Sequence, residues 1–562
     1  MIDALWLTLA LLAGPQGPPP PPPPPPPTPA PRDPSTMKKG TAVIKGHVFT
    51  SDGRPLRRAS IRISGDDPRD ALTATSGIEG EYEIRELPAG RFTVQATRSG
   101  YLPAQHGQRA FGEPGTPVSV ANGATIEKID ITMSRAGVIS GRVTDETGDA
   151  ASGVDVRAMQ MQFYLGRRQL VPIASFPLHA TSDDTGQYRI TGLPPGEYLV
   201  AARLRDTWMS DEKEPQMLSY APTYFPGTAD AADGRRVKVS SGQEVGAIDF
   251  PLVPLRAAKL SGTAVASDGA PLARGRIVLS QEIMGPSGGT MSFAGNAIID
   301  EAGAWSIRDV SPGEYIIRAN GTVGDRPTET AALPVTVSGA DIEGLLVAAD
   351  AGGIISGRVV TDTGDPLPSS ASRPVVSTTP VSMITGITRP TPGQDEGVVG
   401  ADGGFSRKSP SGSVVVRVSG LPRGWAIKSI DLGGRDHAGL PIDVRPGQPL
   451  STLTIVVTNK LASLKGQVSD AGGKPAAAHV VLFPADPARW LEAAGNQRTV
   501  RTDRDGTYTF DSIRAGDYFV VAVDTMETWQ MNDPEFLSQQ QSRATKITIA
   551  VEPSIVDLKV ER

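Results

Sequence analysis

GQYRITGLPPGEYLVAA, at residues 186–202, is the stretch of sequence that decides the fold. Tyr188 and Ile190 alternate with polar residues, which is the pattern of a strand with one buried face. The Pro-Pro-Gly turn then leads directly into the apolar run YLVAA. Together these features predict a hairpin whose second strand lies in the centre of a β-sandwich.

The same frame recurs along the chain, and its two framing glycines keep an offset of ten residues. The four copies are Gly80 to Gly90, Gly186 to Gly196, Gly303 to Gly313 and Gly506 to Gly516. A further copy, GGFSRKSPSGSVVVRV, keeps Phe405 and the apolar strand, but its glycines at 403 and 412 are nine residues apart. We interpret this copy as degenerate.

A second frame precedes each hairpin: a strand containing Gly is followed seven residues later by a turn Gly. The five pairs are Gly46 and Gly53, Gly141 and Gly148, Gly262 and Gly269, Gly357 and Gly364, and Gly466 and Gly473. Glycine is the residue that reaches positive φ without strain, so the second member of each pair predicts a tight turn between two strands.

The repeats predict an all-β chain of five tandem sandwiches with roughly seven strands each. The expected boundaries are 41–136, 137–256, 257–352, 353–460 (the degenerate copy) and 461–562. The spacing between the two frames varies, so insertions are expected there while the framework stays fixed. Linkers between copies are nearly absent, which predicts a semi-rigid rod.

The N-terminal segment predicts export. Residues 1–14 contain the apolar run Ala4–Ala13, which has the length of a signal peptide and about half that of a membrane-spanning helix. The alternative is a disordered apolar tail. Residues 15–40 form a linker with ten consecutive prolines, Pro18–Pro27, which favour a stiff polyproline II spacer. We expect an extracellular or periplasmic protein without a transmembrane span.

Composition excludes several classes of function. The 562 residues contain 55 Lys and Arg against 61 Asp and Glu, a formal net charge of −6, without a basic block for phosphates. Nucleic acid is therefore not an expected partner. The absence of cysteine excludes thiol nucleophiles, disulfides and zinc–thiolate or iron–sulfur sites.

The opening GxVxxxxGxP and closing GxYxIxxLPPGxYxVxA patterns resemble the carboxypeptidase regulatory-like domain. The resemblance covers roughly residues 41–562 and implies a transthyretin-like (prealbumin-like, Ig-like) sandwich, related to starch-binding-like and Cna B-type folds. In that family the domain is an accessory attached to peptidases, outer-membrane receptors or surface proteins. No peptidase domain accompanies it here, so the resemblance implies support, spacing or binding rather than peptidase activity.

Searches for catalytic or metal sites lead to none, and no cofactor is expected. The five histidines (His47, His106, His179, His437 and His479) have no metal-ligand spacing. GPSGG at 285–289 lacks the strand-to-helix context of a nucleophile elbow. Acidic turns such as SDDTGQY and TDRDGTY are explained by hairpin chemistry. The isopeptide crosslinks of Cna B-type relatives would pair Lys45 with Asp130 and Lys465 with Asp557, but Ala stands where the proton-shuttling acid is usually found.

Aromatic residues in loops are the remaining candidates for a binding surface. They are Trp208, Tyr220, Tyr224 and Phe225 in the second copy and Trp529 in the fifth. Such rings stack on sugars or peptide side chains; alternatively, they cap the open end of a sandwich core. We expect an exported, non-catalytic cell-envelope protein with a spacer and binding role, with a glycan, a cell-wall polysaccharide or another envelope protein as partner. The alternatives are a purely structural or adhesion scaffold and an accessory subunit of a peptidase or outer-membrane receptor.

Overall fold

The computed structural model describes residues 40–560 with a few gaps. The gaps are 66–70, 109–110, 114, 165, 173–178, 286–287, 324–328, 351, 366, 368–372, 382–396, 423 and 504. The predicted signal peptide, the predicted linker up to residue 39 and the centre of GPSGG lie outside the described residues. We call residues 41–136, 137–256, 257–352, 353–460 and 461–562 units 1 to 5.

The predicted all-β class is confirmed, since strands make up most of the described chain and its one α-helix is α1 (Pro534–Gln541). Short 3-10 helices are η1 (Ala231–Asp233), η2 (Pro487–Arg489), η3 (Glu492–Ala494) and η4 (Thr528–Asn532). None of the helices in the described part of the chain has the length and apolar character needed to cross a bilayer.

One sheet of every unit is built around its opening strand. These strands are β1 (Ala42–Thr50), β10 (Gly137–Thr144), β23 (Ala258–Val265), β30 (Gly353–Thr361) and β38 (Ala462–Ser469). Each pairs antiparallel with the first hairpin strand: β4 (Glu81–Leu87), β14 (Gln187–Leu193), β26 (Ala304–Val310), β32 (Gly404–Ser409) and β41 (Thr507–Ile513). The topology is therefore the same in all five copies, the degenerate fourth included.

Each opening strand also pairs, in parallel, with the end of its own unit. The partners are β8 (Thr125–Ile126) and β9 (Ile131–Met133), β20 (Glu244–Val245) and β21 (Phe250–Pro251), β29 (Ile342–Ala348), β37 (Leu450–Thr458), and β44 (Ser554–Ile555) and β45 (Leu558–Lys559). Unit 4 extends this sheet with β34 (Ala426–Leu432) and β35 (Arg435–Asp436).

The second sheet of each unit contains the apolar hairpin strand. In unit 1 it consists of β2 (Ser60–Ser64), β3 (Ala71–Thr75), β5 (Gly90–Thr97), β6 (Ala104–Gln105) and β7 (Val118–Val120). In unit 2 it consists of β11 (Asp155–Tyr164), β12 (Arg167–Pro172), β13 (His179–Thr181), β15 (Gly196–Arg203), β18 (Thr223–Tyr224) and β19 (Arg236–Val239). In unit 3 it consists of β24 (Ala273–Gly285), β25 (Gly288–Ile298), β27 (Gly313–Thr322) and β28 (Glu329–Val337). In unit 4 it consists of β31 (Val375–Pro380), β33 (Gly412–Ser419) and β36 (Ile442–Val444). In unit 5 it consists of β39 (His479–Pro484), β40 (Arg498–Arg501), β42 (Gly516–Val523) and β43 (Thr545–Ile549). Unit 2 adds a small sheet of β16 (Thr207–Met209), β17 (Met217–Tyr220) and β22 (Pro254–Arg256).

Each unit has its own hydrophobic core between its two sheets. The core residues of units 1 to 5 fall within 42–133, 139–252, 258–349, 355–457 and 462–560. A smaller cluster on the other face of the second sheet of unit 5 joins Phe483 and Trp490 to Leu537 of α1. We therefore propose the five predicted segments as the domains of the chain.

A repeated contact explains why the opening strand needs its glycine. A Cβ on Gly141 would lie 2.1 Å from the carbonyl oxygen of Ile248, and the equivalent distances in the other units run from 1.7 to 2.1 Å. The same carbonyl accepts a hydrogen bond from Tyr188 Oη at 2.6 Å. The pattern repeats in units 1 and 5 with Tyr82 and Tyr508. Close approach and hydroxyl together fix the closing segment against the opening strand.

The turn glycines behave as predicted. The second member of every seven-residue pair has a φ between 78° and 91°, and the first glycine of every hairpin frame has a φ between 74° and 81°. The acidic turns also follow hairpin chemistry: Asp183 Oδ1 accepts hydrogen bonds from the backbone N–H groups of Thr185 and Gln187, both at 2.9 Å. These carboxylates therefore stabilise their own turns.

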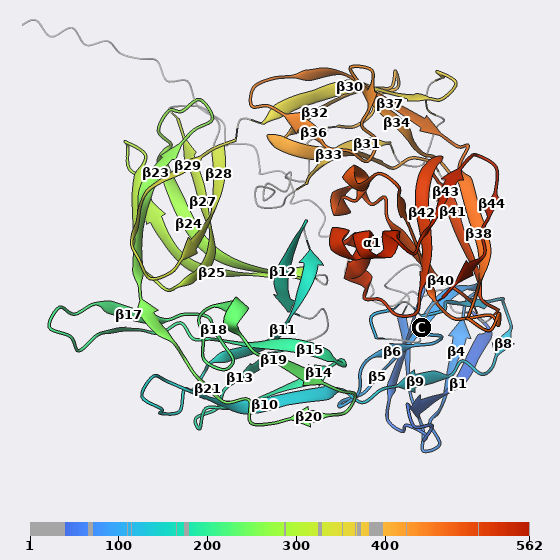
Figure 1. Cartoon of the computed structure of the whole chain (residues 1–562), viewed down its shortest axis with the longest axis horizontal. Helices are drawn as coiled ribbons and strands as arrows, with labels where there is room; N and C mark the ends of the chain where they lie inside the picture. The colour runs from blue at the N-terminus through green and yellow to red at the C-terminus, as the bar shows by residue number, and fades with distance from the viewer. Residues whose placement is uncertain are drawn as a thin grey trace, which may run out of the picture.

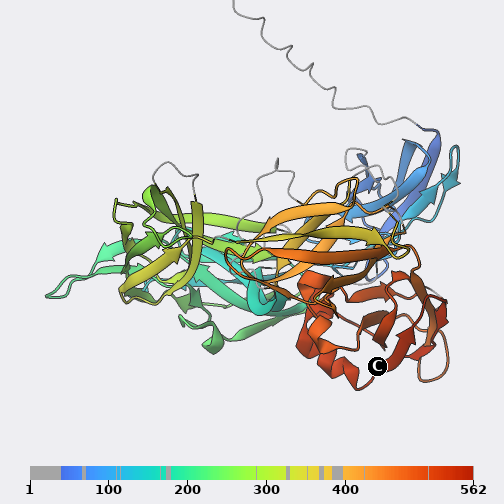
Figure 2. The ribbon, with the colours of Figure 1, turned by 90° about the horizontal axis from the view of Figure 1, so that it is seen from above.

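The predicted semi-rigid rod is wrong. Figure 1 shows the five units arranged around a centre, with unit 5 beside both unit 4 and unit 1, and Figure 2 shows the same packed arrangement from above. Side chains of unit 5 contact residues more than 360 positions away in units 1 and 2. Polar side chains outside the repeated frames make these contacts between distant units, and repeat spacing does not indicate them.

Candidate functional site

Of the aromatic residues of unit 2 that were predicted to form a binding surface, some are partly exposed and others are buried. Trp208, on β16, is half-buried against the core of the unit. Its ring centroid lies 4.6 Å from that of Tyr220, with the two rings tilted by 42°. Tyr220 is buried, and its hydroxyl donates to Glu146 Oε2 at 2.6 Å. The pair thus presents one edge, that of Trp208, to solvent.

Phe225 serves the core, whereas Tyr224 is half-buried. The Phe225 ring packs edge-on against Phe250, with centroids 6.0 Å apart, and the Arg235 guanidinium lies 4.4 Å from its centroid. Tyr224, on β18, lies in a partly buried setting where desolvation raises the pKa of its phenol. Of the four aromatic residues in this loop, Trp208 and Tyr224 retain the exposure that ligand stacking needs.

Trp529 is placed elsewhere in the molecule. It belongs to η4, which contacts α1 within unit 5 and β11 of unit 2. Figure 1 shows α1 near the middle of the molecule, while β17, the neighbour of β16, lies at the far left. The structure therefore does not bring Trp529 together with the aromatic loop. Contact of these five residues with a carbohydrate stays a prediction.

A buried carboxylate joins the first unit to the last. Glu113 of unit 1 accepts a hydrogen bond from His479 Nε2 at 2.8 Å and a second, very short one from Arg501, both in unit 5. The side chains of Glu113 and His479 are 9% and 10% exposed. In this shielded setting a charge-assisted contact is stronger than on an open surface.

The hairpin β11–β12 of unit 2 reaches unit 5 at a second point. Arg168 donates to Asp533 Oδ2 at 2.7 Å and lies 2.6 Å from Glu535 Oε2. Asp533 is buried and also caps α1, since its Oδ1 accepts the backbone N–H of Glu535 at 3.0 Å. Beside it, the backbone N–H of Gly166 donates to Glu492 Oε2 at 3.1 Å. The hairpin tip is thus held by charges of unit 5.

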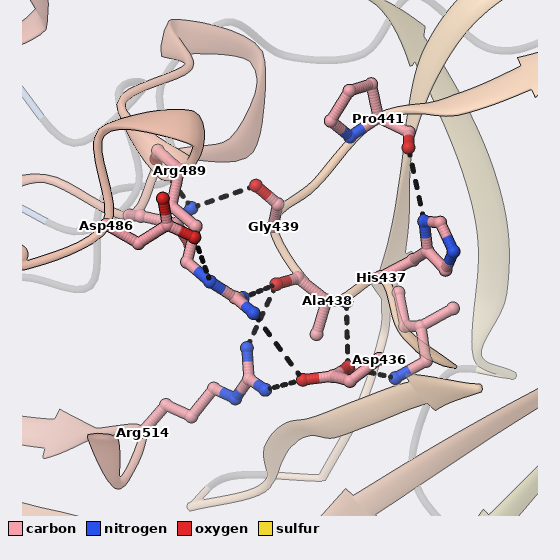
Figure 3. Close-up of polar contacts among 10 residues, drawn as sticks. Asp436, His437, Ala438, Gly439, Pro441, Asp486, Arg489 and Arg514 are labelled. Atoms are coloured by element: carbon pink, nitrogen blue, oxygen red, sulfur yellow. Dashed lines mark hydrogen bonds and ion pairs between the residues drawn. The ribbon is translucent and has the colours of Figure 1, made fainter. Parts of the chain in front are cut away.

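Units 4 and 5 meet through the loop at residues 436–441, drawn in Figure 3. The carbonyl oxygen of Ala438 accepts hydrogen bonds from Arg514 at 3.0 Å and from Arg489, and Asp436 forms an ion pair with Arg514. Asn496 donates to the carbonyl of Gly439 at 3.3 Å. A cavity of about 460 Å³ in unit 5 adjoins this junction and is lined by Arg489, Asn496 and Arg514.

Asp436 is organised from its own unit as well. Its Oδ1 accepts the backbone N–H groups of Ile430 at 3.0 Å and Ala438 at 2.9 Å. Burial alone would raise the pKa of this carboxyl, but these hydrogen bonds and Arg514 hold the pKa below its ordinary value. The loop therefore presents a fixed negative charge to two arginines of unit 5.

None of these junction residues was found from the sequence. Arg168 lies between the two glycine frames of its unit, whereas Glu113 and Asp436 follow the hairpin frames of theirs. The partners of all three residues are far away along the chain. The variable spacing between the frames indicated the insertion that contains Arg168, but not what this insertion contacts. No spacing signal marked Glu113 or Asp436.

Comparison with known families agrees with the resemblance described above. The model of the carboxypeptidase regulatory-like domain matches residues 43–134 and 138–207. These two tandem segments, in units 1 and 2, therefore carry that domain. No match was found among curated proteins.

Several solved structures, two pilins among them, are similar to the chain. The streptococcal ancillary pilin is 11% identical, with a TM-score of 0.19, over 55% of this chain and 98% of that chain. The TIE protein of Bacillus anthracis is 11% identical, with a TM-score of 0.15, over 76% of each chain. The major pilin subunit BcpA of Bacillus cereus is 10% identical, with a TM-score of 0.13, over 55% of this chain and 99% of that chain. Scores this low carry no argument about the function of this chain.

Proposed function

We propose that this chain is an exported, non-catalytic structural and adhesion scaffold of the cell envelope, in which five sandwich units close into one compact body. The observation that carries the proposal is the closure of the array through unit 5. Glu113 of unit 1, Arg168 of unit 2 and Asp436 of unit 4 each meet side chains of that unit. Charged groups outside the repeated frames thus hold the scaffold together.

A closed array holds its loops in fixed positions relative to one another, as an adhesion surface requires. The loops extend from a framework in which a close backbone approach repeats in all five units, joined in units 1, 2 and 5 by a tyrosine hydroxyl contact. Rigid presentation lowers the entropy lost when a partner binds. The predicted spacer role then belongs to the proline-rich segment rather than to an extended row of domains.

The proposal is tested by locating the full-length protein and removing it. Cells that produce it are fractionated and treated with external protease. We expect the chain in the envelope or the medium, accessible to protease, and we expect deletion of its gene to reduce attachment of the cells to surfaces or to each other. Recovery of the chain in the cytoplasmic fraction would contradict the proposal.

A second candidate is carbohydrate binding by the aromatic loop of unit 2. It is favoured by the partial exposure of Trp208 and Tyr224. A glycan array probed with the full chain tests it: we expect binding that Trp208→Ala weakens. Binding that is identical in the variant removes this candidate.

A further inference from the structure

A second cavity lies between units 2 and 3 and has an unusual charge. Its volume is about 230 Å³, and its walls include Arg157, Arg203, Arg205, Tyr220, Gln281 and Tyr315. Residues of β11, β15 and the segment after β15 form one wall, and residues of β24, β25 and the turn before β27 form the other. The cavity exists only where the two units meet.

Direct hydrogen bonds fix the two walls against each other. Arg205 donates to Gln281 Oε1 at 2.7 Å and to the carbonyl oxygen of Phe293 at 2.9 Å. Nearby, Ser219 Oγ donates to Ser311 Oγ at 2.7 Å. The cavity is therefore a built feature of the junction and not a gap between loosely placed domains.

The arginines come together because of strand register. Asp155 of β11 stands opposite Arg203 of β15, and Arg157 stands opposite Ala201, so these residues share one face of the sheet. The alternate residues Val156, Val200 and Ala202 belong to the core. Side chains alternate between the two faces of a strand, so the charged set lies on the outer face, which unit 3 covers.

Among the described residues that line this cavity are three guanidinium groups and a single carboxylate, that of Asp155. Asp155 Oδ2 is already engaged by Arg157, at 2.8 Å from Nε and 2.7 Å from an Nη atom. Arg205 is engaged by Gln281 and Phe293. Among the described residues, the guanidinium group of Arg203 has neither a hydrogen bond nor an ion pair. The partial burial of Arg203 lowers the pKa of its guanidinium, and so do the positive charges of Arg157 and Arg205. Tyr224 and Asp155 act in the opposite direction without cancelling this effect.

An unpaired, partly buried cation is costly, and an anion would relieve that cost. The two tyrosine hydroxyls do not compete for it, since Tyr220 donates to Glu146 Oε2 at 2.6 Å and Tyr315 donates to the carbonyl of Ser311 at 2.7 Å. Their rings remain as apolar walls. A planar guanidinium matches a carboxylate bidentately, and flat apolar walls suit a compact body such as a sugar ring.

We propose that this junction cavity binds a small carboxylate anion of the size of a hexuronate, with Arg203 as the residue that pairs with the carboxylate. Asp155 and Arg205 position the site: the first neutralises Arg157, and the second ties the two units together. The assignment does not depend on the scaffold role proposed above.

The test is a titration of the full chain with glucuronate, followed by NMR or calorimetry, with neutral glucose as the size-matched control. We expect a dissociation constant on the order of 0.1–1 mM for glucuronate, as for a ligand with few atoms. Because the contact is charge-assisted, we expect affinity to fall about 10-fold or more in Arg203→Gln. Arg498→Gln, at the other cavity in unit 5, should leave it unchanged.

Binding of a polyuronate chain distinguishes two sources of the carboxylate ligand, an acidic polysaccharide and a small metabolite. If it binds as well as the free acid, the ligand is a residue of an acidic polysaccharide; if only the free acid binds, the ligand is a small metabolite. Either result supports the carboxylate site. Absence of glucuronate binding by the parent chain, equal binding by Arg203→Gln or equal binding of glucose would overturn it.

The unfolding temperature of Arg203→Gln distinguishes an arginine that binds a ligand from one that only holds the structure together. Removal of an unpaired buried charge is neutral or stabilising, whereas loss of a structural ion pair is destabilising. We therefore expect Arg203→Gln to unfold at or above the temperature of the parent chain. A clear fall in that temperature would mean that Arg203 holds the junction together, and the proposal would fail.

Discussion

The repeated fold depends most directly on one contact, the close approach of a carbonyl oxygen in each unit's closing segment to the glycine of the opening strand. The opening-strand glycine allows this oxygen to approach, and in units 1, 2 and 5 a tyrosine hydroxyl donates to it. Unit 3 has Trp305 at the tyrosine position, and its buried Nε1 has no hydrogen-bond partner among the described residues. The tyrosine therefore provides a hydrogen bond that its frame does not strictly require.

Removal of that hydroxyl tests its contribution. We expect Tyr188→Phe to lower the free energy of unfolding of unit 2 by about 1–2 kcal/mol, because the Ile248 carbonyl loses its buried donor. Denaturant unfolding of the full chain, followed by a probe in unit 2, measures this. Gly141→Ala, whose Cβ would meet the same oxygen, should cost more, about 3 kcal/mol or above. Equal stability of all three proteins would show that the contact is dispensable.

Asp436 makes the junction of units 4 and 5 sensitive to acid. Its folded pKa lies below the ordinary 3.8, so its contribution to stability is complete above about pH 3.8 and is lost as the pH falls through the lower folded value. We expect Asp436→Asn to cost about 1 kcal/mol at neutral pH, where Arg514 loses its ionic partner. The difference from the parent chain should shrink below pH 3.8. Unfolding at several pH values measures it, with the exposed Asp211→Asn as control; a constant difference would contradict the assignment.

At the scale of elements, the hairpin β11–β12 is the insertion that organises the centre of the molecule. Its first strand contacts η4 of unit 5, its second contacts β24 of unit 3, and Arg168 reaches Asp533 and Glu535. Figure 1 shows β12 projecting toward the middle, between units 3 and 5. A single extended hairpin of unit 2 thus connects its own unit to two others, units 3 and 5.

Truncation of Arg168 tests this role. We expect Arg168→Ala to destabilise the contact of units 2 and 5 by about 1–2 kcal/mol, because the buried Asp533 carboxylate loses its partner while Arg168 itself is partly solvated. Hydrogen exchange at α1 and β12 should rise in the variant. The control is Arg189→Ala, whose ion pair with Glu244 is exposed on both sides and should cost less than about 0.5 kcal/mol. Equal effects of the two changes would contradict the role of the hairpin.

The frames could be predicted from the sequence because they are local. Positive φ at Gly53 or Gly148 and the alternation of Tyr188 and Ile190 depend on neighbouring residues, and each copy confirms the others. The burial of Tyr220 and Phe225 depends on residues such as Glu146 and Phe250, which no spacing rule connects to the loop. The pairing of Glu113 with His479 depends on how whole units curl, so it appears only in the assembled chain.

At the scale of the whole molecule, contacts between units that are not neighbours in sequence distinguish a compact scaffold from a flexible row of domains. Neighbouring units in such a row contact only each other, whereas here unit 5 contacts units 1, 2 and 4. Each contact alone is small, but forming one of them holds the units of the other contacts close together and so raises their effective concentration. The energy of closure is therefore shared among the three junctions.

The chain has no cysteine, so an introduced pair reports closure without background. We expect the double variant Glu113→Cys with Arg501→Cys to react intramolecularly with a short bifunctional maleimide, because the two long side chains that the cysteines replace meet between units 1 and 5. Non-reducing electrophoresis should show a faster-migrating monomer. A matched pair, Glu113→Cys with Arg435→Cys in unit 4, should not crosslink.

In small-angle scattering, Glu113→Gln combined with Arg168→Ala should increase the maximum dimension of the chain, since both links to unit 5 are weakened. A parent chain that already scatters as an extended rod, or an equal yield for both cysteine pairs, would show that the ring does not form in solution.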